Sequence, residues 1–287
     1  MARQVEARPP SMMLESAHVP RRRVLSWKLV RKWLSPVLWN VVPPLVALFI
    51  AGLVWQLVVE ARHTPVYILP KPTVILHRLF GDLGYFAHRG WETLYEAIAG
   101  FALATAIAIA LAIVMAHSRV VERTLFPIAI LVKVMPIVAI APLLVIWFGF
   151  GVWPKISVAA LITFFPVLVN AIVGLRSVNP SALDFLRSLD ATPLEIFWRL
   201  RVPSSLPYLF AAFRISIPLS VIGAVVAEYP FGDRGLGKVI AISYNNLDMP
   251  TMFSAIVTLA VIGIGLTVLT AAVERRLVFW HESNLAQ

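Results

Sequence analysis

The stretch RSVNPSALDFLRSLDATPLEIFWRLRVPSSLP, residues 176–207, is a long polar interruption between two strongly apolar runs. Within it, Thr192-Pro193-Leu194-Glu195 is typical of a helix start, with Thr as N-cap, Pro at the first helical position and an acid at the third. Ser181, followed by Asp184, resembles a capping box that opens an earlier helix. The pattern therefore predicts two short helices with a sharp joint at Asp190-Ala191.

These two helices carry large apolar side chains outside any predicted span, at Phe185, Leu189, Phe197 and Trp198. An apolar face on a polar loop needs something to cover it. Two interpretations stay open at this point. Either a separate protein docks on the loop, or the loop is an interfacial element that rests on lipid or on its own helix bundle.

The chain as a whole is too apolar for an ordinary soluble enzyme. Its 287 residues are 59% hydrophobic and 14% charged, with a mean hydropathy of +0.82, whereas soluble domains carry about 25% charged residues. A bilayer crossing takes about 20 apolar residues. Runs of that kind cover about 41–59, 94–116, 125–150, 156–175, 208–227 and 251–273. We expect an all-α polytopic membrane protein with about six transmembrane helices, the third kinked at its prolines.

The distribution of charge predicts the orientation. The net charge is +10, and 16 of the 25 Lys and Arg residues lie in segments 1–39, 117–123, 176–207 and 274–287. Because positive loops stay in the cytoplasm, we expect both termini and the loop 176–207 there. This removes support for a nucleic-acid partner. The expected organisation is a basic cytoplasmic tail (1–39), a membrane domain (40–280) and a short cytoplasmic tail (281–287).

Several polar residues fall within or beside the expected spans. Lys133 and Arg214 are charges inside spans, which makes them candidate pathway residues, but we favour snorkelling toward cytoplasmic headgroups or an internal hydrogen bond. Asn170 is more typical of a contact between helices than of a substrate ligand. Glu96 and Glu228 lie near the outer boundary, where we expect solvent to hydrate them.

No motif in the chain indicates catalysis. The segment 232–238, GDRGLGK, matches the start of a phosphate-binding loop, but Val239 stands where Ser or Thr would reach Mg²⁺. A turn before an external helix explains its glycines better. The six histidines are scattered, and the chain has no cysteine. We therefore expect no metal, no cofactor and no enzymatic activity in this chain.

The loop 176–207 resembles the EAA signature of permease subunits of ATP-binding-cassette (ABC) importers. That signature reads Glu-Ala-Ala, three residues, Gly, nine residues, then Ile-x-Leu-Pro. This chain has Asp184-Phe185-Leu186, three residues, Asp190, nine residues, then Leu200-Arg201-Val202-Pro203. The spacing is the same and Pro203 is identical. Asp190 replaces the glycine, and Asp tolerates the left-handed backbone that such a turn requires.

Other stretches are similar to the nitrate/sulfonate/taurine-type family of these permeases, over residues 40–280. They are Pro136–Leu144, Trp147–Gly151, Phe164–Val167, Gly174–Val178 and Arg234–Gly237. Leu183-Asp184-Phe185, Arg187-Ser188-Leu189 and Ser220–Ala224 look closest to the branch associated with thiamine-pyrimidine precursors and riboflavin.

The resemblance implies a type I ABC importer permease fold in a prokaryotic inner membrane. It implies three partners: cytoplasmic ATPase subunits that bind the ATP, an extracytoplasmic substrate-binding protein, and a second permease copy, which we expect to make a homodimer. The coupling element would be about Ser181–Arg201. The residues expected at the ATPase contact are Asp184, Leu189, Asp190, Ala191, Thr192 and Pro203.

The expected substrate is a small organic solute, such as a thiamine pyrimidine precursor or riboflavin. Nitrate, taurine and alkanesulfonates are alternatives for the same machinery. A stand-alone secondary transporter is a second hypothesis, but it needs ligands for a coupling ion and the spans hold few acids. A membrane-embedded enzyme is disfavoured because the spans hold no cluster of His, Asp or Glu.

Overall fold

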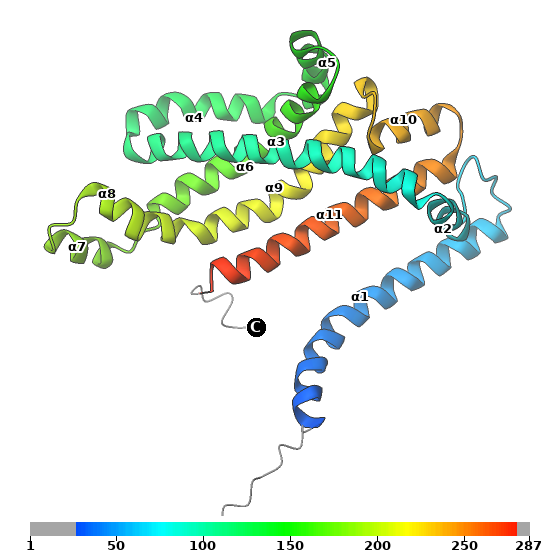
Figure 1. The fold of residues 1–287 in the computed structure, drawn as a ribbon, viewed down its shortest axis with the longest axis horizontal. Coiled ribbons are helices and arrows are strands. Elements are labelled where there is room, and N and C mark those ends of the chain that lie inside the picture. Colours follow the sequence, from blue (N-terminus) through cyan, green and yellow to red (C-terminus); the bar gives the residue numbers. More distant parts are fainter. Residues whose placement is uncertain (1–26, 280–287) are drawn as a thin grey trace, which may run out of the picture. The chain divides into compact units, whose positions relative to one another are not determined.

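The computed structural model describes residues 27–279, with side chains from residue 42 onward. All regular elements in this range are helical (Figure 1). They are α1 (Trp27–Ala61), α2 (Pro72–Gly81), α3 (Leu83–His117), α4 (Arg119–Val134), α5 (Ile137–Phe148), α6 (Val152–Arg176), α7 (Pro180–Ser188), α8 (Pro193–Ile196), the π-helical turn η1 (Phe197–Arg201), α9 (Val202–Phe231), α10 (Leu236–Asn245) and α11 (Met249–Leu277). The chain divides into two units, residues 1–54 and 55–287. The described part of the first unit is one long helix.

The described helices give the expected number of membrane spans. Five are long and apolar enough to cross a bilayer, and they cover 42–61, 83–117, 152–176, 193–231 and 249–277. A sixth span results if α4 and α5 are counted as one broken crossing, bent by 100° between them. The prediction of an all-α membrane protein with about six spans is therefore confirmed.

The break between α4 and α5 lies at Met135-Pro136. Proline disfavours the helical conformation in the residue before it, and Met135 is extended, with φ −61° and ψ 132°. Pro127 and Pro142 stay inside their helices. The expected kinks in the third span thus become one sharp break at one of the three prolines.

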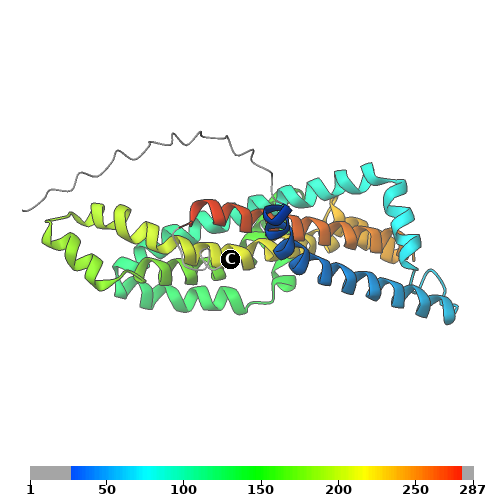
Figure 2. The same cartoon turned by 90° about the horizontal axis from the view of Figure 1, so that it is seen from below.

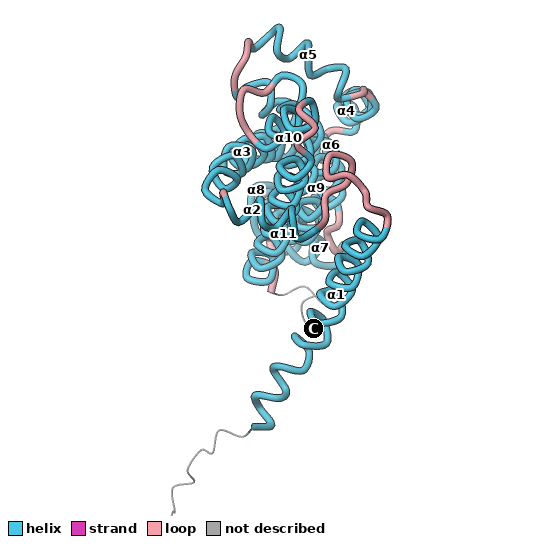
Figure 3. The backbone as a smooth tube through the Cα atoms, turned by 90° about the vertical axis from the view of Figure 1, so that its right-hand side faces the viewer, coloured by secondary structure: helices cyan, strands magenta, loops and turns pink. Residues whose placement is uncertain are grey.

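Helices α3, α6 and α9 form the centre of the second unit and lie side by side in the view along the bundle (Figure 3). Their close approach depends on small residues, because a smaller side chain lets two backbones come together. Ala104, Ala108 and Ala112 of α3 are at most 1% exposed. A Cβ atom added to Gly100 would lie 2.7 Å from the carbonyl oxygen of Ile156.

The two ends of this unit differ. Helices α7 and α8 lie at one end, and α2 and α10 lie at the other (Figures 1 and 2). Helix α2 is fastened to α11, since Arg78 Nε donates to Thr251 Oγ1 at 3.0 Å and Ser254 Oγ donates to the carbonyl of Ile75 at 3.1 Å.

The loop expected over 176–207 is shorter than predicted because the helix after it starts early. From Pro193 the chain is helical through α8, η1 and α9 to Phe231. A π-helical turn joins α8 to α9 directly before Pro203. There the N–H of Val202 bonds to the carbonyl of Phe197, five residues back, and Pro203, which has no N–H, lies in the first turn of α9.

Candidate functional site

The joint between α7 and α8 is a compact turn closed by backbone hydrogen bonds. Helix α7 ends with the N–H of Ala191 bonded to the carbonyl of Leu186 at 3.1 Å and the N–H of Asp190 to that of Arg187 at 3.0 Å. This is the Schellman arrangement, which needs one left-handed residue. Asp190 supplies it with φ +55°. The sharp joint at Asp190-Ala191 is as predicted.

The start of α8 matches the sequence signal, whereas the start of α7 does not. Thr192 Oγ1 accepts the N–H of Glu195 at 3.3 Å, and the Glu195 carboxylate accepts the N–H of Thr192 at 2.9 Å. This is the complete capping box. For α7 the prediction of Ser181 as N-cap is wrong. The N-cap is Asn179, whose Oδ1 accepts the N–H of Ser181 at 2.9 Å, and Pro180 takes the first helical position, which suits its fixed φ.

The helical pair exposes an apolar surface, formed by Phe185, Leu189, Leu194 and Trp198, which we call the hairpin surface. These side chains are 62–66% exposed, and no residue of α7 is buried. Exposed ion pairs flank it, Asp184 with Arg187 at 3.6 Å and Glu195 with Arg199 at 3.8 Å. An apolar surface with a charged rim is typical of a protein docking site.

The six residues expected at the ATPase contact do not all lie on this surface. Asp184, Leu189, Asp190 and Thr192 are exposed, and Ala191 is partly buried in the joint. The Thr192 hydroxyl is engaged in the capping box. Pro203 is partly buried in the first turn of α9, so it contributes to the start of that helix and not to the hairpin surface. The sequence singled out Phe185 and Trp198 only as apolar residues, and Leu194 only as part of a helix start.

The helical pair α7–α8, which we call the hairpin, packs against the spans on either side of it. Ile196 is buried, and the ring of Phe197 lies 6.1 Å from that of His117 at the end of α3. On the α6 side, a Cβ atom at Gly174 would lie 3.0 Å from the Cα of Ser205 in α9. A displacement of the hairpin must therefore move the ends of these helices as well.

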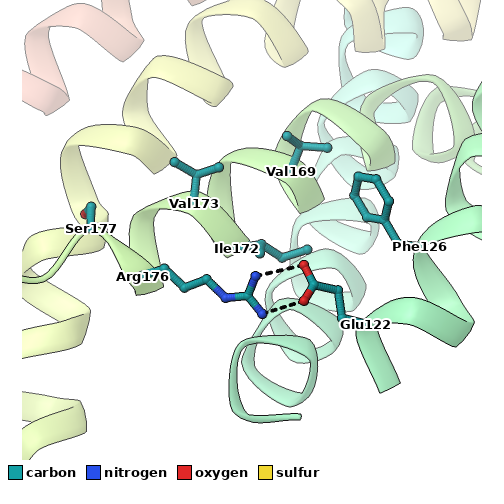
Figure 4. A pocket seen from close by; sticks show the side chains of 7 residues that line it. All are labelled: Glu122, Phe126, Val169, Ile172, Val173, Arg176 and Ser177. Atoms are coloured by element: carbon teal, nitrogen blue, oxygen red, sulfur yellow. Dashed lines mark hydrogen bonds and ion pairs between the residues drawn. The ribbon is translucent and has the colours of Figure 1, made fainter. Parts of the chain in front are cut away.

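Arg176, the last residue of α6, ties three helices together just before the hairpin (Figure 4). Its Nη1 donates to Glu122 Oε1 at 2.8 Å and its Nη2 to Glu122 Oε2 at 2.7 Å, a two-pronged contact with α4. Nη2 also donates to the carbonyl of Met115 in α3 at 2.9 Å. The pair borders a hollow of about 420 Å³, further lined by Phe126, Val169, Ile172, Val173 and Ser177. No local sequence pattern predicts this contact, because its two partners lie 54 positions apart.

The three polar residues expected within spans lie apart and have separate partners. Asn170 Nδ2 donates to the carbonyl of Pro166 in its own helix at 2.8 Å. Lys133 is exposed, with Nζ 4.6 Å from the centre of the Phe165 ring. Arg214 Nε donates to Glu274 Oε2 at 2.7 Å, which joins α9 to α11.

The expectation that solvent hydrates Glu96 and Glu228 is wrong, since they are 1% and 0% exposed. They lie where α3, α6 and α9 approach the residues before α10. Lys155, also buried, contacts Glu96 and Asp233. Partial burial works against ionisation of Asp233, but the hydrogen bond and charge of Lys155 outweigh it and lower the pKa of Asp233 to about 2. The turn predicted over 232–238 covers only residues 232–235, because α10 begins at Leu236 and includes Gly237.

Comparison with known proteins identifies the family. Residues 104–279 match the family described as the binding-protein-dependent transport system inner membrane component. This chain belongs to that family. It is a multi-pass permease of the inner membrane, and its resemblance to the nitrate/sulfonate/taurine-type permeases, with the riboflavin and thiamine branch, is confirmed.

Curated relatives cover most of the chain. The riboflavin transport system permease protein RibX of Chloroflexus aurantiacus is 36% identical over 83% of this chain and 90% of its own length. The formylaminopyrimidine transport permease protein ThiX of Halalkalibacterium halodurans is 36% identical over 74% of this chain and 84% of its own. The taurine transport system permease protein TauC of Escherichia coli is 30% identical over 87% of this chain and 94% of its own length.

A solved structure has the same fold. A chain of the inward-facing MetNI methionine ABC transporter superposes with a TM-score of 0.59 at 17% identity, over 69% of this chain and 98% of that one. The permease is thus a type I ABC importer fold, as the sequence predicted.

Proposed function

We propose that this permease forms the translocation pathway of an ATP-driven importer and couples to a separate ATPase through the segment 181–201. The observation that carries the proposal is the hairpin surface, four large apolar side chains exposed on a capped turn at one end of the second unit. Burying one such side chain on a partner stabilises the complex by about 1.5–3 kcal/mol. Asp184, Leu189, Asp190, Ala191 and Thr192 contribute from this hairpin, and Pro203 contributes by fixing the start of α9.

Coupling then follows from how the hairpin is attached. Closure of the ATPase subunits around ATP displaces α7 and α8, and the displacement passes directly into α9, because α8, η1 and α9 are one continuous helical segment. It reaches α3 and α4 through Arg176. ATP drives the switch between inward and outward access only if it favours one of these states over the other.

The assembly that we propose contains two copies of this permease, cytoplasmic ATPase subunits and an external binding protein that delivers substrate. The proposed cargo is a thiamine pyrimidine precursor or riboflavin. The names of RibX and ThiX, the relatives at 36% identity, support it. Taurine, alkanesulfonates and nitrate are the alternatives, taurine supported by TauC.

The experiment that tests this function is reconstitution of the permease with its ATPase and binding protein. The double variant Asp184→Lys and Leu189→Lys places two positive charges on the hairpin surface. We expect the amount of ATPase that co-purifies with it to fall at least tenfold, and we expect it to show no substrate uptake. Leu247→Lys, at a leucine that is 58% exposed near the other end of the unit, is the control and should retain both. Normal assembly of the double variant would refute the coupling assignment. Uptake of riboflavin, pyrimidine precursor and taurine by the intact complex identifies the cargo.

A further inference from the structure

A buried group of charges joins the ends of α3, α6 and α9 that lie away from the hairpin. Glu96, Lys155 and Glu228 are 1%, 2% and 0% exposed. Lys155 Nζ lies 2.7 Å from Glu96 Oε1 and 3.1 Å from Asp233 Oδ1. Asp233 is half exposed and also pairs with Arg234 at 3.2 Å, so if both buried glutamates were ionised, their two negative charges would share the single buried positive charge of Lys155. Uncompensated charge in a buried site is too costly to persist without a further positive partner.

The hydrogen bonds of Glu228 indicate where that partner belongs. Its Oε2 accepts the Thr93 hydroxyl at 3.1 Å and the N–H of Gly237 at 2.6 Å. Its Oε1 is buried and has no hydrogen-bond partner, and the same holds for Oε2 of Glu96. Thr93, whose hydroxyl contacts Glu228, lies three residues before Glu96 in α3, so the two carboxyl groups meet at the same face of that helix. Ionised carboxylates only accept hydrogen bonds, so a bond between them requires one proton.

The backbone of the segment 232–237 packs closely on Glu228. Gly235 has φ +93°, and a Cβ atom there would collide with the Glu228 carboxylate. A Cβ atom at Gly237 would lie 2.7 Å from the Cβ of Glu228. Within residues 27–279, no cluster of His, Asp and Glu side chains is arranged to hold a metal ion. A proton is the smallest positive species that can supply the missing donor between these carboxyl groups.

We propose that Glu96 and Glu228 together bind one proton, held between Oε2 of Glu96 and Oε1 of Glu228, and that this proton keeps the segment 232–237 docked on α3 and α9. No other bond changes when the proton binds. The carboxyl pair then carries one negative charge, which Lys155 balances. This inference is independent of the coupling role and of the cargo.

The docked segment depends on three backbone donors that reach across to the helices. The N–H of Gly235 donates to Glu92 Oε2 at 3.0 Å, that of Leu236 to Thr93 Oγ1 at 2.9 Å, and that of Gly237 to Glu228. The charged groups around the site are Lys155 on α6, Glu92 on α3 with its partners Arg89 and His88, and Asp233 with Arg234 in the segment itself. Loss of the proton would place two negative charges face to face and weaken this docking.

Infrared spectroscopy of the full-length permease in lipid nanodiscs tests the proposal directly. We expect the C=O stretch of a protonated buried carboxyl at pH 7, which disappears as the pH is raised. Glu228→Gln and Glu96→Gln should each remove it, since the remaining carboxylate no longer shares a proton. Glu274→Gln, at a carboxylate paired with Arg214, is the control and should keep it. Absence of the band from the wild type at pH 7, or its persistence in both variants, would overturn the proposal.

The pH dependence of thermal stability gives a second readout. The native pair holds a proton that a solvated glutamate does not hold at neutral pH, so unfolding releases it and stability falls as the pH rises. One released proton changes the unfolding equilibrium by up to about tenfold per pH unit. Glu228→Gln mimics the protonated acid and should fold with a flatter pH profile, whereas Glu228→Ala should melt well below both. An equally steep profile in Glu228→Gln would count against the shared proton.

Discussion

At the scale of single residues, Asp190 shows how a departure from a family pattern can preserve a geometry. The resemblance placed Asp where glycine is usual, and the backbone there is left-handed, with φ +55°. A non-glycine residue pays roughly 1–2 kcal/mol in that region, less for Asp because its short polar side chain bonds locally. The hairpin therefore keeps its turn at a modest cost.

This cost predicts a graded substitution series at residue 190. Asp190→Gly should leave the stability of the hairpin unchanged or raise it. Asp190→Val should destabilise the hairpin by about 1–2 kcal/mol relative to the wild type, because a β-branched side chain clashes in the left-handed region. Hydrogen exchange of residues 180–196 measures the opening of the hairpin. Val should raise exchange there and reduce ATPase binding. Equal exchange in both variants would mean that the turn adopts another conformation in the assembled transporter.

The position of a polar residue near the predicted end of a span did not predict whether its side chain is buried. Glu96 and Glu228 were expected to be solvated because a one-dimensional sequence shows only their distance from an apolar run. Their burial depends on the segment 232–237 folding back over α3 and α9, a long-range contact that no local pattern encodes. The sequence shows glycines at 235 and 237, but it does not show that they are needed because their backbone lies against the Glu228 side chain.

At the scale of elements, the start of α8 and the joint of the hairpin followed from local chemistry, whereas the N-cap of α7 and the end of the loop did not. Capping signals act within four residues, so Thr192 and Glu195 were readable. The continuation of α8 into α9 passes through a π-helical turn directly before Pro203, and proline on its own predicts a stop. Pro136 followed the rule, whereas Pro127 and Pro142 remained within helices.

Arg176 provides the prediction at this scale. Arg176→Lys loses the two-pronged contact with Glu122, because an ammonium cannot match the planar fork of a guanidinium. The Arg176 and Glu122 side chains are 38% and 27% exposed, so solvent screening keeps the loss of stability small. We expect normal ATPase binding but at least a fewfold drop in substrate transported per ATP. Arg187→Lys, on exposed α7, is the matched control, and the idea fails if both variants transport alike.

At the scale of the whole molecule, composition and apolar runs were enough to predict an all-α membrane protein, because the requirement for about 20 apolar residues per crossing is physical and general. The division of the third run into α4 and α5 was beyond this reasoning. Hydropathy measures length and apolarity, and it does not measure the 100° bend between two helices.

Orientation is the property of the whole molecule that charge predicts and that a direct experiment can test. The hairpin and the segment around α10 lie at opposite ends of the second unit (Figure 1), so the positive-inside rule places them on opposite sides of the membrane. The chain has no cysteine, which makes single replacements clean reporters. Ser188 in α7 and Asn246 after α10 are both exposed. We expect a membrane-impermeant maleimide to label Asn246→Cys on intact cells, and Ser188→Cys only after permeabilisation. The reverse labelling pattern would show that the topology is inverted. It would also contradict the proposed ATPase contact, because ATP and its ATPase act from the cytoplasm.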